Sequence, residues 1–316
     1  MSPSEPHTDP WYVLSKDLMF LNQQRWEDHQ SVVAGQTGTL RELLRITLSH
    51  KALALMDLIR RNRPQALRKF DQISMRDDDL ATQAILMAKQ LAGKSVVFMG
   101  DNDCASLALG ILGGQLGYPL PAKMVIVDFD ERLLRAQSQF ARRYGFRHLM
   151  DFRLYNAFEP VPRDLQNHFD WFYTNPPYGA SNYGMSVQLF INRGCEMTKP
   201  AGYGCIIIPH DEERKWTQSA MLSTQRFLAN RGWVITDKVN DLHHYHLDDD
   251  NELTSSTLIV HDAASITLDE SIRVYDNRRI EHHEIPQFYG KSVQPPYPRF
   301  IRADGTEEYC NDREAA

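Results

Sequence analysis

Two kinds of hydrophobic pattern divide this chain. Between residues 40 and 63, apolar side chains recur every three or four positions up to Pro64, which predicts an amphipathic helix. A second helix is predicted to start at three consecutive aspartates, Asp77–Asp79, whose negative charges suit a helix N-terminus. We therefore expect residues 1–90 to form a small helical N-terminal region.

After residue 90, short apolar runs alternate with amphipathic stretches. Six runs are expected to be strands: 95–100, 123–130, 169–177, 203–210, 233–239 and 256–262. A weaker strand should end before Asn156, and helices are expected between the strands, for example over 131–145 and 213–232. This pattern predicts a doubly wound α/β fold. Its Rossmann-like sheet should have seven strands, mostly parallel, and end in an antiparallel hairpin, because the last two strands leave no room for a helix between them.

The pattern also sets the expected domain boundaries. Residues 91–262 should form the catalytic domain. Residues 263–316 are polar, contain four prolines and show little periodicity, so they form a C-terminal extension. Such an extension could cover the active site, contact a second copy in a homodimer or be partly disordered.

Composition excludes several classes of protein. Hydrophobic residues make up 42% of the 316 residues, enough to build a core. There are 35 Lys+Arg and 41 Asp+Glu, a formal net charge of −6, whereas a protein that grips duplex DNA normally carries a basic surface. Mean hydropathy is −0.47, and no apolar run approaches the ~20 residues needed to span a bilayer. These values argue against nucleic-acid partners and membrane segments.

The N-terminus and the cysteines bear on location and metals. The first residues lack the basic and apolar regions of a signal peptide, so we expect a cytoplasmic protein. The cysteines are scattered and form no CxxC motif: Cys104, Cys195, Cys205 and Cys310. This spacing favours reduced thiols, and we expect no metal.

The turn after the first strand carries acids instead of the usual glycines. Asp101, Asn102 and Asp103 follow Gly100, so the G-x-G-x-x-G pattern that cradles a pyrophosphate is absent. Carboxylates at this edge of the sheet suit a cationic sulfonium or ammonium group. We expect Asp101 and Asp103 to be catalytic and Gly100 and Asn102 to contact the cofactor. Alternatively, the two acids only cap the next helix.

Two further strand ends predict contacts to a nucleoside. Asp128, at the end of the second strand, is placed to accept hydrogen bonds from both ribose hydroxyls. Asp130 is the second candidate for that role, or the N-cap of the following helix. Asn156, after the third strand, is expected to read the edge of an adenine base.

The sequence Asn175-Pro176-Pro177-Tyr178 ends the fourth strand. Two prolines fix the backbone and remove two N–H donors, so that the Asn175 side chain and nearby carbonyls converge on a substrate amine. Tyr178 offers an aromatic face to a base or a cation. We expect Asn175 and Tyr178 to be catalytic and Pro176 to lie beside the cofactor.

A histidine-rich stretch in the last hairpin leaves several interpretations open. His243, His244 and His246 precede Asp248–Asp250. Such a cluster could bind a metal, form a solvated loop or make an acidic collar for a polycation. A metal is the least favoured of these, because consecutive residues on a strand point to opposite faces.

Several of these motifs together resemble one family. They are FDQ at 70–72, GDND at 100–103 followed by Ser106, VDFDERL at 127–133, the Pro-Pro motif of the fourth strand and WVITD at 233–237. This combination is similar to the branched-chain polyamine synthases, also called bis-aminopropyl spermidine synthases. The resemblance implies a class I S-adenosylmethionine-dependent transferase fold.

The resemblance also implies a reaction. The family moves the aminopropyl group of decarboxylated S-adenosylmethionine to a secondary amine of spermidine, which leaves methylthioadenosine. Carried over to this chain, Asp101 and Asp103 would surround the transferred group and the small cationic amine, and Asp128 would hold the ribose.

The chain departs from the family pattern in one direction. Asn102, Asn156, Asn175 and Tyr178 stand where the pattern has acids. An amide cannot replace a carboxylate as a general base, so Asp101 or Asp103 would take that role, or the acceptor is less cationic than spermidine. Two alternatives follow: an S-adenosylmethionine-dependent amino N-methyltransferase that uses the NPPY motif, and a catalytically impaired nucleoside-binding homologue.

Overall fold

The computed structural model describes residues 48–180, 182–211, 213–246, 252–263, 277–289 and 295–309. The chain divides into two units, 1–49 and His50–Ala316, and every element below belongs to the second unit. The start of the first predicted helix, the Asp248–Asp250 cluster and Cys310 lie outside the described residues.

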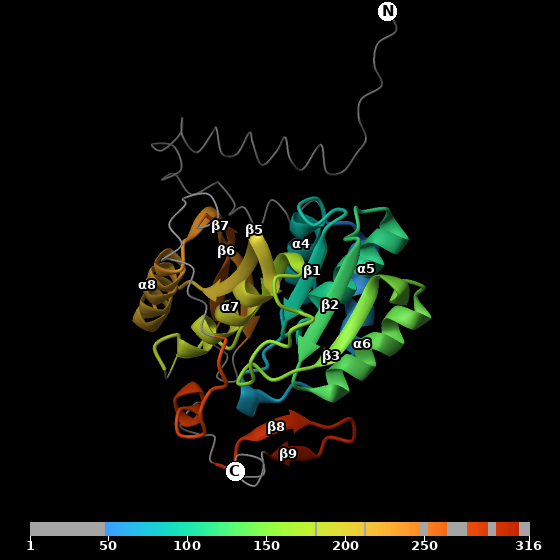
Figure 1. Cartoon of the computed structure of the whole chain (residues 1–316). Coiled ribbons are helices and arrows are strands. Elements are labelled where there is room, and N and C mark those ends of the chain that lie inside the picture. The colour runs from blue at the N-terminus through green and yellow to red at the C-terminus, as the bar shows by residue number, and fades with distance from the viewer. Residues whose placement is uncertain are drawn as a thin grey trace, which may run out of the picture. The chain divides into compact units, whose positions relative to one another are not determined.

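A seven-stranded sheet forms the centre of the second unit (Figure 1). Its strands are β1 Ser95–Met99, β2 Lys123–Asp128, β3 Met150–Leu154, β4 Phe169–Thr174, β5 Thr198–Pro209, β6 Trp233–His246 and β7 Glu252–Asp262. Their order is β3-β2-β1-β4-β5-β7-β6, and β7 is antiparallel to both of its neighbours. This confirms the predicted doubly wound, Rossmann-like sheet of seven mostly parallel strands that ends in an antiparallel hairpin.

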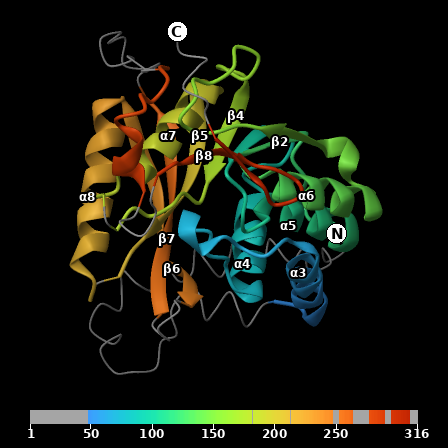
Figure 2. The same cartoon turned by 90° about the horizontal axis from the view of Figure 1, so that it is seen from below.

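Helices cover both faces of the sheet. Their bounds are α3 His50–Asn62, α4 Asp77–Ala88, α5 Ala105–Leu116, α6 Glu131–Arg143, α7 Met185–Met197 and α8 Lys215–Asn230. Figure 2 shows α3 to α6 on one side of the strands and α7 with α8 on the other. Apolar strand residues such as Val97 and Phe172 are fully buried between these layers. Helices on both faces thus bury the apolar side chains of the central strands, which stabilises the sheet.

Two segments outside the sheet lie near the carboxyl ends of its parallel strands. The first includes the short 3-10 helix η2 Arg68–Phe70. The second contains the 3-10 helix η5 Ile285–Phe288 and the antiparallel strands β8 Pro298–Ile301 and β9 Glu307–Tyr309. A bridge between Asp130 and Ile301 joins β8 to the chain just after β2. The polar C-terminal extension therefore has an ordered part that docks beside the strand ends.

The histidine stretch turns out differently from a solvated loop. Strand β6 extends to His246, and the buried His243 ring lies 3.0 Å from Ser255 Oγ and 2.9 Å from Gln83 Oε1. Among the described residues, no cluster of three His, Cys, Asp or Glu side chains could hold a metal ion. No described helix is long and apolar enough to cross a membrane. Cys104, Cys195 and Cys205 are free and buried.

Candidate functional site

A pocket of about 410 Å³ opens at the carboxyl edge of the sheet. Its walls come from the ends of β1 to β4, from residues 69–73 and from the end of η5 with Tyr289. Eight of the ten predicted site residues line it: Gly100, Asn102, Asp103, Asp128, Asn156, Asn175, Pro176 and Tyr178. Parallel pairing therefore brings together the polar residues that follow four separate strands.

Asp101 and Asp130 are the two predicted site residues outside the pocket lining. The Asp101 carboxylate accepts hydrogen bonds from the backbone N–H of Ala105 at 2.8 Å and the hydroxyl of Ser106 at 2.5 Å, so it caps α5. Asp130 caps α6 through the backbone N–H of Arg132 at 3.0 Å and pairs with the Arg132 guanidinium at 2.7 Å. Both acids thus make the helix-capping contacts of the alternative interpretation, and neither is among the residues that line the pocket. Their roles toward a ligand stay predictions.

Gly100 ends β1 in a left-handed conformation, with a φ of +70°. A Cβ at this position would lie 3.1 Å from the ring of Phe190, which also lines the pocket. A side chain at position 100 would be both strained and crowded. What Gly100 supplies to the site is therefore its compact backbone.

Asp103 and Asn175 form a hydrogen-bonded pair in the pocket wall. Asp103 is buried and accepts from the backbone N–H of Met75 at 2.6 Å and from Asn175 Nδ2. Asn175 Nδ2 also lies 2.9 Å from the Tyr245 hydroxyl, whereas its Oδ1 has no hydrogen-bond partner among the described residues. Burial raises the pKa of Asp103 above its ordinary value, and the Asn175 donor opposes this shift. The pair thus fixes a carboxylate whose basicity exceeds that of a solvated aspartate.

Asp128 holds its carboxylate at the end of β2. It accepts from the backbone N–H of Asp130 at 2.9 Å and of Asp101 at 3.2 Å. Burial raises the pKa of Asp128 to about 7. A rigid carboxylate at this strand end can accept hydrogen bonds from a diol, as the sequence predicts.

The other two amides are tied to neighbouring segments. Asn156 donates from Nδ2 to the carbonyl of Arg299 at 2.7 Å, and its Oδ1 accepts from the backbone N–H of Phe158 at 2.9 Å. Asn102 Nδ2 lies 3.2 Å from Ser74 Oγ. Each end of the Asn156 amide thus has one partner in the protein and keeps one donor or acceptor position in the pocket lining, so its predicted reading of an adenine edge stays a prediction.

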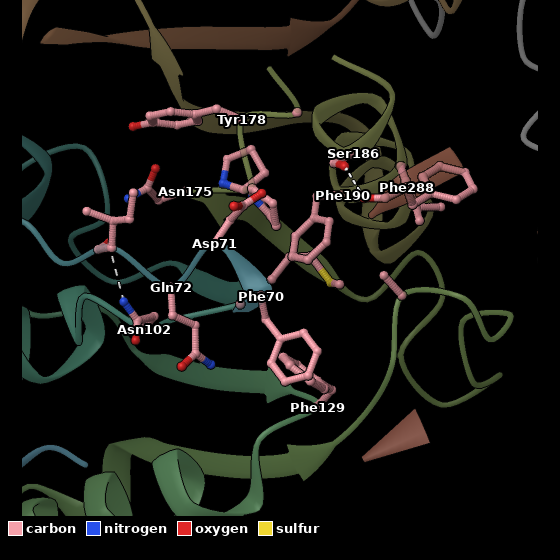
Figure 3. Close-up of a pocket in the computed structure, with 18 of the residues that line it drawn as sticks. Phe70, Asp71, Gln72, Asn102, Phe129, Asn175, Tyr178, Ser186, Phe190 and Phe288 are labelled. Atoms are coloured by element: carbon pink, nitrogen blue, oxygen red, sulfur yellow. Dashed lines mark hydrogen bonds between the residues drawn. The ribbon is translucent and has the colours of Figure 1, made fainter. Parts of the chain in front are cut away.

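Asp71, the central residue of the FDQ motif, lines the pocket although it was not among the predicted site residues. Its backbone is left-handed, with φ 56° and ψ 24°, and its carboxylate accepts no hydrogen bond in the part of the chain that the structure describes. Figure 3 shows the side chain extending into the pocket. It is open to solvent there but flanked by protein, and this desolvation raises its pKa. The FDQ motif was the signal that pointed to this residue.

A group of aromatic rings forms one end of the pocket. Its members are Phe70, Phe129, Phe158, Phe288 and Tyr289. The Phe70 and Phe129 centroids are 5.4 Å apart, and those of Phe158 and Phe288 are 5.5 Å apart. Phe129 sits within the predicted VDFDERL motif, but Phe288 and Tyr289 belong to the extension, where periodicity gave no signal. Such rings suit the flat face of a nucleobase.

Comparisons with known proteins point to one family. Residues 52–285 match the model of the branched-chain polyamine synthase A C-terminal domain. Over 193 residues the chain is 30% identical to the N(4)-bis(aminopropyl)spermidine synthase of Thermococcus kodakarensis, which covers 59% of this chain and 50% of that protein. The synthase of the same name from Thermus thermophilus is 30% identical over 195 residues, covering 58% and 50%. The chain thus spans about half the length of the curated relatives it matches.

A solved structure is similar in fold. It is the crystal structure of the branched-chain polyamine synthase from Thermus thermophilus in complex with N4-aminopropylspermidine and 5′-methylthioadenosine. Its TM-score is 0.59 at 23% sequence identity, and the match covers 73% of this chain and 67% of that one.

Proposed function

The chain belongs to the branched-chain polyamine synthase family, and from this premise we propose that it moves an aminopropyl group from decarboxylated S-adenosylmethionine to an amine of spermidine or a related polyamine. The observation that carries the proposal is the lining of the pocket, where Asp71, Asp103 and Asp128 lie among aromatic rings. Carboxylates and π faces both stabilise cations, and both substrates of this reaction are cationic.

The aromatic end of the pocket and Asp128 would hold the nucleoside part of the donor. Asp103 follows β1 and would lie near the sulfonium and the chain that is transferred. A buried carboxylate there repels the carboxylate of S-adenosylmethionine, whereas the decarboxylated donor ends in an ammonium group. The lining therefore favours the decarboxylated donor.

The reaction itself needs positioning and a base. The lone pair of the acceptor nitrogen attacks the carbon bound to the sulfonium, the C–N bond forms, and the C–S bond breaks with its electron pair going to sulfur. Methylthioadenosine leaves as a neutral thioether. The surplus proton on nitrogen passes to a carboxylate, for which Asp103 and Asp71 are suited because their pKa values are raised.

A second candidate reaction is N-methylation from S-adenosylmethionine. It is favoured by the sequence Asn175-Pro176-Pro177-Tyr178 at the end of β4 and by the unpartnered Asn175 Oδ1, which could accept from a substrate N–H. The two reactions differ in the mass that they add to an amine.

Mass spectrometry with either donor and spermidine tests both proposals. We expect aminopropyl adducts with the decarboxylated donor and no methyl adducts with S-adenosylmethionine. In the same assay Asp103→Asn should lose 100-fold or more of the transfer rate, because the amide cannot take the proton, while methylthioadenosine binding changes by only a few-fold.

Asp237→Asn is the matched control, because Asp237 is exposed on β6 and lies outside the pocket lining. If only methyl adducts form, the protein is an N-methyltransferase and the proposed aminopropyl transfer is wrong. Unchanged transfer in Asp103→Asn would remove Asp103 from the mechanism.

A further inference from the structure

We propose that Phe288 and Tyr289, at the end of η5, and Tyr297, just before β8, form a wall of the nucleoside subsite and that Asn156 positions this wall. The inference rests on the proposed function, because it presumes a nucleoside donor. The three residues of this wall lie beyond residues 52–285, the part of the chain that matches the family model.

Two residues of this wall, Phe288 and Tyr289, supply rings at the aromatic end of the pocket. The centroids of Tyr289 and Phe158 are 5.8 Å apart, and Phe158 follows β3 directly after the predicted nucleoside contacts. The ring centroid of Tyr289 also lies 6.1 Å from that of Phe70, which belongs to η2. A base that enters this end of the pocket would meet aromatic faces from three separate parts of the chain.

The strand β8 is docked on the chain that follows β2 and β3. The backbone N–H of Ile301 donates to the carbonyl of Phe129 at 3.0 Å, one residue after Asp128. Asn156 Nδ2 donates to the carbonyl of Arg299 at 2.7 Å. The hairpin thus rests on the same two strand ends that would bind ribose and base, as its place beside them in Figure 1 shows.

A stacked pair of tyrosines connects β8 to the pocket. Tyr297, just before β8, lies parallel to Tyr289, with centroids 4.6 Å apart and an interplanar angle of 6°. Arg299 is only two residues further along. Asn156 thus fixes the backbone of β8, which places Tyr297 against Tyr289, and this gives Asn156 a positioning role.

The chemistry at position 156 requires an amide. Its Nδ2 must donate to a carbonyl while its Oδ1 accepts from the Phe158 backbone N–H. A carboxylate of the same shape would satisfy the second contact but would place an oxygen against the Arg299 carbonyl. This provides a physical reason for an asparagine where the family pattern has an acid.

The other side of the wall is anchored to the loop that follows the NPPY motif and to the first turn of α7. The Phe288 carbonyl accepts from Ser186 Oγ at 3.0 Å and from Asn182 Nδ2 at 3.3 Å, and the first of these is drawn in Figure 3. The Phe288–Tyr289 pair is therefore held from two sides.

Calorimetric titration of the full-length protein with methylthioadenosine and with spermidine tests the inference. Asn156→Asp should raise the Kd for methylthioadenosine about fivefold or more, since a lost buried hydrogen bond has that effect on an equilibrium. The Kd for spermidine should stay within about twofold of the wild-type value, because the amine is proposed to bind near Asp103 and not at the aromatic end of the pocket. Asn167→Asp is the matched control: it makes the same change at an exposed position outside the pocket lining.

Variants of Tyr289 test the wall itself. Tyr289→Ala should also raise the methylthioadenosine Kd about fivefold or more, whereas Tyr289→Phe keeps the ring and should bind like the wild type. If Asn156 acts through Tyr289, the double variant Asn156→Asp/Tyr289→Ala should bind no more weakly than the worse single variant.

Three outcomes would overturn the inference. Wild-type Kd values for methylthioadenosine in both Asn156→Asp and Tyr289→Ala would show that these residues form no wall of the nucleoside subsite. If the two effects on the Kd multiply in the double variant, Asn156 does not act through Tyr289. Both failures leave wild-type binding and transfer intact. If the wild-type protein neither binds methylthioadenosine nor transfers an aminopropyl group, the proposed function fails and the inference falls with it.

Discussion

At the scale of single residues, Asp128 shows how this pocket tunes a carboxylate. Two backbone N–H groups fix it, yet burial raises its pKa to about 7. The ionised form accepts hydrogen bonds from two ribose hydroxyls, whereas the protonated form has one acceptor fewer. Binding of a nucleoside would therefore favour the ionised form and lower the pKa of Asp128.

We expect the affinity for methylthioadenosine to fall several-fold as the pH is lowered from 8 to 6, through the pKa of Asp128. Near pH 7 binding should also release protons, which titrations in buffers of different ionisation enthalpy would measure. Asp128→Asn should bind more weakly and lose this pH dependence. A pH-independent Kd in the wild type would show that Asp128 does not accept from the ligand.

The amides illustrate what the sequence could and could not tell about the site. Their positions were predicted correctly, because each follows a recognisable strand. Their roles depend on partners far along the chain: Asn156 on Arg299, Asn102 on Ser74 and Asn175 on Asp103. No local pattern reveals such partners, so the replacement of acids by amides was interpreted only as a loss of charge.

At the scale of elements, helix α5 shows how a buried acid, Asp101, stabilises the fold. Its residues from Ala105 to Leu112 are all buried, so its first turn cannot rely on water for hydrogen bonds. Asp101 accepts from Ala105 and Ser106 there, and Gln137 Nε2 donates to its carbonyl at 2.8 Å. The cap therefore joins β1, α5 and α6.

Removing this cap should destabilise the whole unit. We expect Asp101→Ala to lower the free energy of unfolding by about 1–2 kcal/mol, measured by urea denaturation. Asp101→Asn retains an acceptor oxygen and should lose less. An Asp101→Ala protein as stable as the wild type would show that water or a rearranged turn replaces the carboxylate.

The elements also mark the limit of sequence-based prediction. All seven strands and the antiparallel hairpin were predicted, and the central strands were the clearest because burial on both faces leaves continuous apolar runs. The edge strand β3 has no such run and was the weaker prediction. Strand β6 was predicted too short: beyond Val239 its alternation is broken by an irregular register with β7. For the extension, a place over the active site was only one of three alternatives, and η5 and β8 were not predicted, since Tyr289 and β8 find their place only through contacts to the chain after β2 and β3.

At the scale of the whole molecule, the acids that contribute to the net charge of −6 include some with raised and some with lowered pKa values. Burial raises the pKa of Asp101 to about 8 and that of Asp128 to about 7. Hydrogen bonds lower the pKa of Asp170 and of Glu284 to about 2. The second pair stabilises the folded state at any pH above its unfolded pKa of roughly 4. The first pair contributes its full stability only below that unfolded pKa, and the contribution is lost as the pH rises toward the folded pKa values.

The unfolding free energy should therefore fall as the pH rises from 5 to 8. In this window the folded state binds more protons than the unfolded state, because the folded pKa values of Asp101 and Asp128 are raised. We expect a lower Tm at pH 8 than at pH 5.5, measured by thermal denaturation. The difference should shrink in Asp128→Asn. A Tm that rises over this range would contradict the assignment of these buried acids.

Asp71 carries a further consequence for how far this protein can be stabilised. Its left-handed backbone is a conformation that glycine adopts more readily, so the turn does not need an aspartate for folding. Exchange for glycine would relieve the backbone and remove a raised-pKa carboxylate from the pocket at the same time. If the proposed reaction uses this acid, stability and turnover make opposite demands on position 71, and selection for thermostability alone would tend to remove an acid that selection for activity retains.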